Sequence, residues 1–246
     1  VVIYVGGVAE LTRIKQTATH LEIGAAASLS AIMPILLHHY PDLQEMFTRF
    51  AAPPVRNAGT LGGNIANGSP IGDSMPALIA LGATVILRQG ESQRRLALEN
   101  LYQSYGVNAM QAGEFLECIH VPLPPPAQVF RCYKLSKRFD EDISAVCMAL
   151  AVTIEHSKVV AIRIGCGGLS EIPARARACE QVLQGKPWTE KTIRAAMAAL
   201  NNDFTPISDM RASATYRRQV MQNLLLRFFI ESTDQQEDTR VYDVRP

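Results

Sequence analysis

The residues from Gly59 to Asn64, GTLGGN, have the types and spacing in this sequence that are best suited to chemistry. Glycines let a backbone pass close to a bulky anionic group, and consecutive N–H groups in such a turn form an anion-binding nest. The Thr60 hydroxyl and the Asn64 amide add donors at its rim. A helix that begins near Ser74 could direct its N-terminus to the same place. The segment therefore predicts a phosphate site, with a tightly packed glycine turn as the alternative.

The pattern is neither the GxGxxG of dinucleotide-binding folds nor the GxxxxGK of phosphate-binding loops. The five cysteines stand at positions 118, 132, 147, 166 and 179. Their odd number and the lack of a CxxC pair argue against a disulfide framework, a zinc site or an iron–sulfur cluster held by this chain alone. The histidines at 38, 39, 120 and 156 show no ligand spacing. We therefore expect no metal-binding residue in this chain, and we expect buried thiols in a reducing cytoplasm.

The first half of the chain is predicted to alternate between short strands and helices that position the glycine segment. Apolar residues alternate with polar ones in the strands and recur every three to four residues in the helices. Strands are expected over residues 1–5, 20–26, 84–88, 94–98 and 114–121. Helices are expected from Ser28 or Ser30 onward, from Pro41 until Pro53 and Pro54 end it, and over residues 74–81. Residues 56–73 contain five glycines, which cannot form regular structure throughout.

The proline run over residues 122–126 marks the clearest boundary, because prolines cannot donate backbone hydrogen bonds. The second half is predicted to be a sheet followed by helices. Strands are expected over residues 129–135, 145–155 and 159–165, and helices over 174–183, 189–200 and 212–230. Both halves therefore predict an α+β fold. Residues 233–246 are polar and aperiodic, which predicts a flexible tail.

Composition excludes several classes of function. The chain has 246 residues, 48% of them hydrophobic, and 24 basic side chains against 23 acidic ones. This balance gives no sign of the excess of basic side chains that is typical of nucleic-acid-binding proteins. No apolar run approaches the 18 residues that suggest a membrane span. The N-terminus lacks a basic region and a cleavage-site pattern, so no signal peptide is expected. The chain opens without Met, directly on a strand-like run, and we expect it to be a piece of a longer cytoplasmic protein.

Three segments of the chain resemble one known family. Residues 56–73, RNAGTLGGNIANGSPIGD, with Phe50 before them, closely resemble the second FAD-binding segment of the xanthine oxidase and molybdenum hydroxylase flavoproteins. Residues 133–144, YKLSKRFDEDIS, and 203–213, DFTPISDMRAS, are similar to bacterial xanthine dehydrogenase small subunits. The segments occur in the family's order, and the resemblance covers residues 1 to about 232.

The resemblance implies a fold and a function. It implies a vanillate-oxidase-type FAD-binding domain over residues 1–124 and a CO-dehydrogenase-flavoprotein-like domain over 127–232, with a three-stranded antiparallel sheet and helices. A complete small subunit of this kind also carries two [2Fe–2S] clusters upstream, and its partner is a large subunit that binds molybdopterin. Electrons from hypoxanthine or xanthine, which are oxidised to urate, pass through the clusters to FAD, and FAD reduces NAD.

The resemblance also implies the residues that hold the cofactor. Thr60, Leu61, Gly62, Gly63 and Asn64 are expected to wrap the FAD pyrophosphate. Asp73 is expected to accept hydrogen bonds from the cofactor, Phe50 and Leu116 to pack on its flat rings, and Lys134 to supply a polar contact. Without the resemblance, Phe50 and Leu116 would be core residues, Asp73 a helix cap and Lys134 a solvated charge at a strand edge.

The family's first FAD loop lies upstream of residues like Val1 to Val5, so this sequence is expected to contain only half of a flavin site. We therefore expect weak FAD binding and no activity from the chain alone. Two other functions stay open. The chain could be the flavoprotein subunit of a carbon monoxide or aldehyde dehydrogenase, or a non-catalytic module that docks partner subunits.

Overall fold

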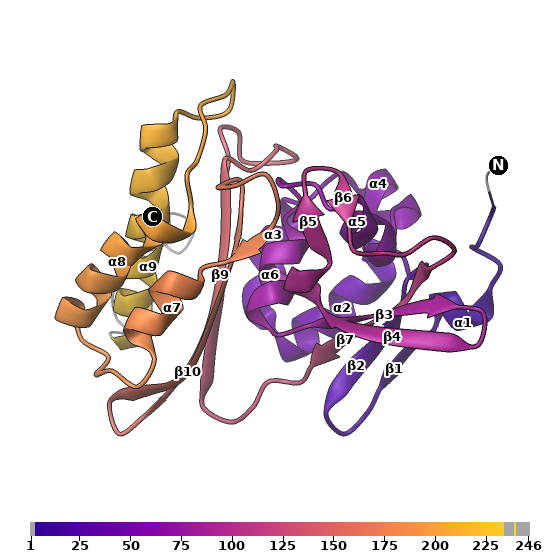
Figure 1. Cartoon of the computed structure of the whole chain (residues 1–246), viewed down its shortest axis with the longest axis horizontal. Coiled ribbons are helices and arrows are strands. Elements are labelled where there is room, and N and C mark those ends of the chain that lie inside the picture. Colours follow the sequence, from indigo (N-terminus) through magenta and orange to yellow (C-terminus); the bar gives the residue numbers. More distant parts are fainter. Residues whose placement is uncertain (1–2, 234–238, 240–246) are drawn as a thin grey trace, which may run out of the picture.

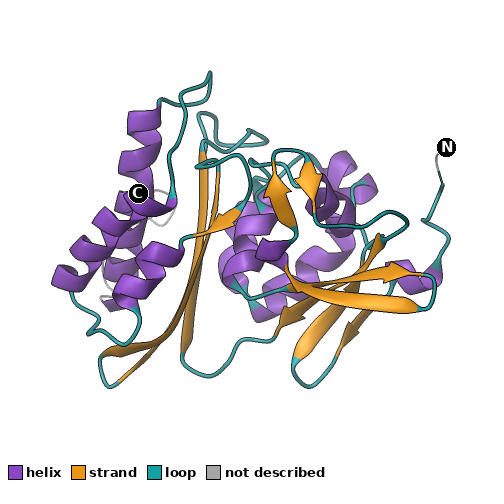
Figure 2. Ribbon diagram, viewed as in Figure 1, coloured by secondary structure: helices purple, strands orange, loops and turns teal. Residues whose placement is uncertain are grey.

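Two antiparallel sheets, each covered by helices, organise the chain in the computed structural model, which describes residues 3–233 and 239. Figures 1 and 2 show the two α+β units side by side, with the long strands β9 (Val146–Glu155) and β10 (Lys158–Gly167) of the second unit between its helices and the first unit. This arrangement confirms the predicted α+β class. The flexible tail predicted for residues 233–246 lies outside the described residues, apart from Thr233 and Thr239.

The first unit contains a five-stranded sheet in the order β1-β2-β7-β3-β4. Its strands are β1 (Ile14–Gln16), β2 (His20–Gly24), β3 (Thr84–Gln89), β4 (Ser92–Ala97) and β7 (Phe115–Pro122). Its helices are α1 (Ala9–Thr12), α2 (Leu29–His39), α3 (Gln44–Thr48), α4 (Pro53–Ala58), α5 (Leu61–Asn67) and α6 (Ser74–Ala80). Short 3₁₀ turns (Pro41–Leu43, Leu98–Asn100) and the small hairpin β5 (Tyr102–Ser104) and β6 (Val107–Asn108) complete it.

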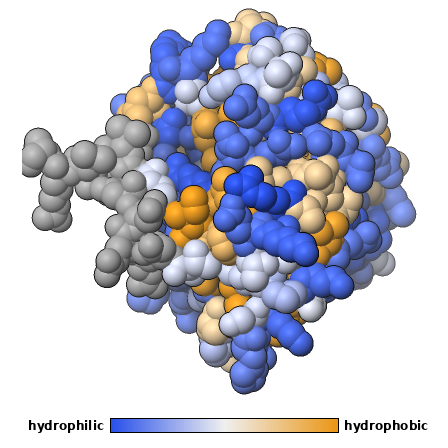
Figure 3. Space-filling view, turned by 90° about the vertical axis from the view of Figure 1, so that its left-hand side faces the viewer, coloured by the Kyte–Doolittle hydropathy of each residue, from blue (hydrophilic) through white to orange (hydrophobic). Residues whose placement is uncertain are grey.

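The second unit contains a four-stranded sheet in the order β11-β10-β9-β8, packed under three helices. Its other elements are β8 (Gln128–Leu135), β11 (Ala174–Arg175), α7 (Arg177–Leu183), α8 (Glu190–Asp203) and α9 (Ala214–Thr233). The two-residue strand β11 adds a fourth strand to the three that the sequence predicts. Figure 3 looks onto the helical side of this unit, where hydrophilic residues cover most of the surface between scattered apolar ones.

Strand β9 joins the two cores. Val146, Met148 and Leu150 pack in the core under α7–α9, whereas Cys147 and Ala149 belong to the core of the first unit. The seven residues from 146 to 152 are all buried, because both faces of the strand are covered. Helix α6 lies against this sheet so closely that a Cβ at Gly165 would be 2.1 Å from the Pro76 carbonyl oxygen. The two units therefore share one continuous interface.

The structure corrects several sequence-based expectations. Residues 3–5 form no strand; Ile3 and Tyr4 are 79% and 86% exposed and have no neighbouring strand to pair with. The edge position beside β2 is taken instead by β1, whose polar residues gave little strand signal. Pro53 and Pro54 begin α4 rather than ending the preceding helix, since proline fits the first turn of a helix, where the N–H groups lack intrahelical partners.

Candidate functional site

A cavity of about 620 Å³ lies in the first unit, between the N-terminal segment, the turn after β2, helix α5 and strand β7. Its walls are almost entirely apolar. They are formed by Ile3, Val5, Leu11, Ala25, Ala26, Thr60, Gly62, Gly63, Ala66, Met110, Glu114, Phe115 and Leu116. Among the expected site residues, Thr60, Gly62, Gly63 and Leu116 therefore meet at one place, although Leu116 is 53 or more residues further along the chain than the others.

The glycine segment begins a helix instead of an open turn. Thr60 is the N-cap of α5, and its hydroxyl oxygen accepts a hydrogen bond from the Gly63 amide at 3.0 Å. The other first-turn amides, within residues 61–64, donate to the carbonyl oxygens of Ala27, Ala25 and Thr60 at 3.0–3.1 Å. The expected nest of free amides is therefore wrong for this structure. The Thr60 hydroxyl was expected at the rim of that nest. In the structure Thr60 lines the cavity and is the N-cap of α5.

Gly62 and Gly63 differ in what they contact. A Cβ at Gly62 would lie 2.4 Å from the carbonyl oxygen of Ala25, so the lack of a side chain lets α5 approach the turn after β2. A Cβ at Gly63 would meet only the Thr60 hydroxyl oxygen, at 2.9 Å, and otherwise open space. Neither glycine has a positive φ. Among the glycines of residues 56–73, only Gly68, at the end of α5, has one. The lack of a side chain at Gly63 thus leaves space in the cavity, whereas the lack of one at Gly62 allows α5 to pack against the turn after β2.

Leu61 and Asn64 do not line the cavity. Leu61 is fully buried in the core of the first unit. Asn64 accepts a hydrogen bond from the Ser74 hydroxyl at 2.5 Å, which ties α5 to the start of α6. In this structure both residues position the helix that carries Thr60 and Gly63.

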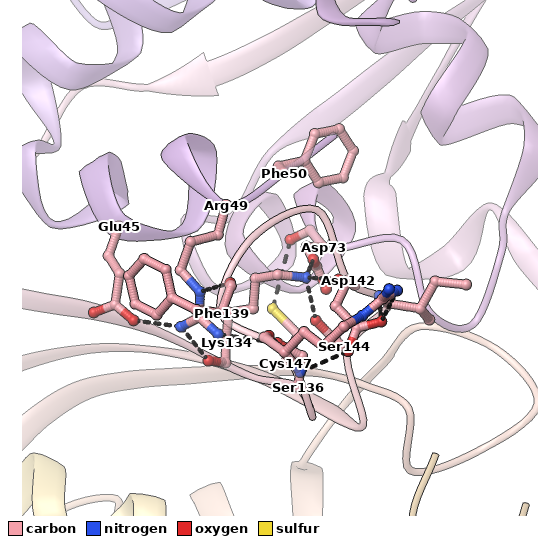
Figure 4. A network of polar contacts seen from close by, with 12 residues as sticks. Glu45, Arg49, Phe50, Asp73, Lys134, Ser136, Phe139, Asp142, Ser144 and Cys147 are labelled. Atoms are coloured by element: carbon pink, nitrogen blue, oxygen red, sulfur yellow. Dashed lines mark hydrogen bonds and ion pairs between the residues drawn. The ribbon is translucent and has the colours of Figure 1, made fainter. Parts of the chain in front are cut away.

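Asp73 and Lys134 form a second, separate group at the interface between the two units (Figure 4). The Lys134 ammonium donates to a carboxylate oxygen of Asp73 at 2.6 Å and to the Ser144 hydroxyl and the Asp142 carbonyl, each at 2.8 Å. The Lys134 and Asp73 side chains are 2% and 3% exposed. Lys134 is therefore not a solvated edge charge, and the Asp73 side chain makes no capping hydrogen bond to α6. Its second oxygen is buried without a partner, which leaves one acceptor for a polar ligand group.

Phe50 does not line the cavity. It follows α3, is half-buried and packs against the core of the first unit. Figure 4 draws its ring on the side of Asp73 away from Lys134. The nine expected site residues thus fall into a cavity group, a pair with Phe50 at the interface, and the two residues that position α5.

Arg49 is a residue that sequence reasoning missed. It is 5% exposed and donates to the Lys134 carbonyl at 2.9 Å, the Ser136 hydroxyl at 2.9 Å and the Phe139 carbonyl at 2.8 Å. It also pairs with Glu45 at 2.7 Å. A single arginine at a helix end carries no sequence signal for this role. It holds the segment after β8 against the first unit.

The second and third resembling segments also meet. The Lys137 ammonium donates to the Met210 carbonyl at 2.7 Å, and both residues line a cavity of about 470 Å³ with Asp209 and Arg211. Outside these groups, His20, Glu22 and His120 bring one possible ligand atom each within 4.8 Å of the others. The sequence spacing gave no sign of this cluster, because its residues come from two strands that lie about 100 positions apart in the chain and become neighbours only in the sheet.

The two halves of the chain match two known families. Residues 1–124 match the FAD binding domain in molybdopterin dehydrogenase, and residues 131–232 match the CO dehydrogenase flavoprotein C-terminal domain. The chain belongs to the FAD-binding flavoproteins of the molybdenum hydroxylase family.

Relatives of this flavoprotein include single subunits and much longer enzymes. The carbon monoxide dehydrogenase medium chain of Afipia carboxidovorans is 31% identical; the match covers 91% of this chain and 78% of that one. The nicotinate dehydrogenase FAD-subunit of Eubacterium barkeri is 28% identical, over 96% of this chain and 82% of that one. The nicotinate hydroxylase of Emericella nidulans is 31% identical over 92% of this chain, which spans only 18% of its length.

A solved structure has the same fold as the flavoprotein. Reconstituted CO dehydrogenase from Oligotropha carboxidovorans superposes with a TM-score of 0.82 at 29% identity, over 93% of this chain and 80% of the other. The α+β fold that the sequence predicts is therefore the fold of this family. Among the described residues, none of the helices has the length and apolar character needed to cross a bilayer.

Proposed function

We propose that this chain is the FAD-carrying portion of a xanthine dehydrogenase, which passes electrons from iron–sulfur clusters through FAD to NAD. The partners would be a large subunit that binds molybdopterin and an iron–sulfur region that also supplies the first FAD loop. The observation that carries the proposal is the family match over residues 1–124, which contain the cavity beside α5. The choice of xanthine and of NAD rests on the resemblance of residues 133–144 and 203–213 alone.

The cavity fits part of FAD better than the rest. Its apolar walls and the open space at Gly63 suit a flat ring, because ring systems are held chiefly by apolar contact. Its polar side chains are Thr60 and Glu114. The hydrogen bond from Arg94, with a second from the Gln111 amide, lowers the pKa of Glu114 and keeps it anionic at the rim. The ionised Glu114 side chain can only accept hydrogen bonds, whereas the Thr60 hydroxyl can donate one, so we propose that Thr60 is the main phosphate contact from this cavity.

FAD, when bound, supplies the two-electron chemistry, while the chain orients it and excludes water. Phe115 is 43% exposed and lines the cavity, so it offers an aromatic face to the cofactor. We expect Phe115→Ala to weaken FAD binding about tenfold, because a ring contact of this size is worth roughly 1.5 kcal/mol. Val160→Ala, at a 41% exposed position on β10, is the control.

The test is a titration of the purified chain with FAD, followed by flavin fluorescence. Saturable binding that weakens in Phe115→Ala and not in Val160→Ala supports the cavity as the flavin site. If FAD does not bind even when the partner subunits are present, the non-catalytic assembly module becomes the better description. Equal affinities in the two variants would place the flavin elsewhere.

A second candidate has equal support: the flavoprotein of a carbon monoxide or aldehyde dehydrogenase. The carbon monoxide dehydrogenase medium chain is 31% identical, and the glyceraldehyde dehydrogenase medium chain of Sulfolobus acidocaldarius is 27% identical. The assembled complex should be assayed with xanthine, carbon monoxide, nicotinate and glyceraldehyde as separate electron donors. Turnover of xanthine with NAD reduction supports the first proposal, and turnover of any other donor alone refutes it.

A further inference from the structure

The outer face of the five-stranded sheet carries a cluster that the flavin site does not use. Leu21 and Ile23 of β2 point into the core and are fully buried. Because side chains alternate along a strand, His20 and Glu22 point to the opposite face. The register pairs Glu22 directly with His120 of β7. The His20 and His120 rings lie 4.5 Å apart between their centroids. Two imidazoles and one carboxylate therefore share one small area of the sheet.

The hydrogen bonds of His20 are compatible with one ring nitrogen acting as a ligand. The Nδ1 of the His20 ring lies 2.9 Å from the Thr19 hydroxyl oxygen and 3.1 Å from the Thr17 hydroxyl oxygen, so a proton on Nδ1 has a hydrogen-bond acceptor within reach. In the tautomer that carries its proton on Nδ1, which metal binding at the other nitrogen requires, the lone pair lies on Nε2. That Nε2 is buried without a hydrogen-bond partner and lies 3.4 Å from a carboxylate oxygen of Glu22. Two electron-rich atoms face each other, an arrangement that a cation between them would stabilise.

We propose that His20, Glu22 and His120 bind one divalent transition-metal ion. Two imidazole nitrogens and a carboxylate oxygen suit zinc, cobalt or nickel, whereas magnesium and calcium prefer oxygen ligands alone. Zinc–nitrogen bonds of about 2.0–2.1 Å place ligand atoms about 3.3 Å apart in a tetrahedral site. The His20–Glu22 pair already has this separation, so closing the site requires His120 to approach. A water molecule would complete the tetrahedral site.

Two neighbouring basic side chains disfavour the binding of a metal ion by charge repulsion, and the removal of one of them tests the proposal. A guanidinium nitrogen of Arg95 donates to the Nδ1 of His120 at 3.0 Å, and the Lys15 ammonium lies 3.8 Å from Glu22. Arg95 is exposed on β4 and can turn into solvent. Its removal frees the His120 ring and lowers the local positive charge. Arg95→Met should therefore bind the metal several-fold more tightly than the unchanged chain, an effect with the opposite sign from loss of a ligand.

The experiment uses the full chain after treatment with a chelator. Zinc is titrated against a chromophoric chelator, and cobalt is added separately to record its visible absorption. We expect one equivalent of zinc to bind and to raise the melting temperature. Glu22→Gln and His120→Gln should each weaken binding at least tenfold, since even changes around metal ligands cost 10- to 100-fold. The double variant His38→Gln, His39→Gln is the control, because these histidines lie on α2, outside the cluster.

The proposal is refuted if the chain binds no zinc, or if the control weakens binding as much as the two cluster variants do. Unchanged affinity in Glu22→Gln would show that Glu22 is not a ligand and would overturn the three-residue site. Circular dichroism of each variant without metal checks its fold. If a ligand variant fails to fold, Arg95→Met still decides, because weaker or equal binding in that variant contradicts the arrangement.

Discussion

The two adjacent glycines of α5 should respond differently to the same small change. In Gly62→Ala, the new methyl group would lie 2.4 Å from the Ala25 carbonyl oxygen and 2.5 Å from its Cβ. Overpacking of this kind costs about 1–3 kcal/mol, and weakening the hydrogen bond from the Gly62 amide to Ala25 costs about 1 kcal/mol more. The better helix propensity of alanine returns up to about 1 kcal/mol. We expect a net loss of about 1–3 kcal/mol.

Gly63→Ala should leave the fold nearly unchanged. Its methyl group would meet only the Thr60 hydroxyl oxygen, at 2.9 Å, and the φ angle there is not positive. Partial loss of the Thr60 cap, about 0.5–2 kcal/mol, and the gain in helix propensity nearly cancel. The methyl group would, however, occupy space in the cavity. We expect FAD binding to weaken about tenfold or more, which corresponds to about 1.4 kcal/mol.

The assay is thermal unfolding of the FAD-free chain, followed by FAD titration of each variant. For a chain of this size, Gly62→Ala should lower the melting temperature by about 2–12 °C. Gly63→Ala and the control Gly7→Ala, whose added Cβ contacts nothing within 4 Å, should stay close to the unchanged chain. If Gly63→Ala destabilised the fold more than Gly62→Ala, or if it left FAD affinity unchanged, the roles assigned to the two glycines would be wrong.

Three further outcomes follow from the buried charges. Lys134→Met should lower the free energy of unfolding in urea by about 3–5 kcal/mol, because it leaves the Asp73 carboxylate charged and buried. Adding Asp73→Asn should recover part of this loss. Equal stability of the single and the double variant would contradict the prediction. Arg49→Ala should speed amide exchange in residues 134–139, with β3 as the internal reference, since three hydrogen bonds to that segment disappear. Despite burial, which acts in the opposite direction, hydrogen bonds from the Arg211 and Ala212 amides lower the pKa of Asp209 to about 2 from its ordinary 3.8. The stabilisation it gives is therefore present above about pH 4 and lost as the pH falls toward 2, and Asp209→Asn should flatten acid unfolding in that window; an unchanged pH profile would exclude Asp209 as its source.

Much of the fold could be predicted because its signals are local. Ser28 was expected as one of two possible caps, and it does cap α2, accepting from the Ala31 amide. The strands expected over residues 84–88 and 94–98 do pair, as the hairpin of β3 and β4, which turns at Gly90. Short or polar elements gave weaker signals. Strand β11 has two residues and β1 has three, so neither carries enough alternation to be recognised.

The sequence determined which residues could be buried, and the tertiary structure decided what they meet. The glycines of α5 were recognisable from sequence, but only the packing against Ala25 shows that Gly62 serves the fold and Gly63 the cavity. Lys134 and Asp73 lie 61 residues apart, so no local pattern could reveal their ion pair. The same holds for His120, which lies opposite Glu22 only because β2 and β7 are neighbours in the sheet. Contacts between distant strands depend on how the chain closes on itself, and that information is not local.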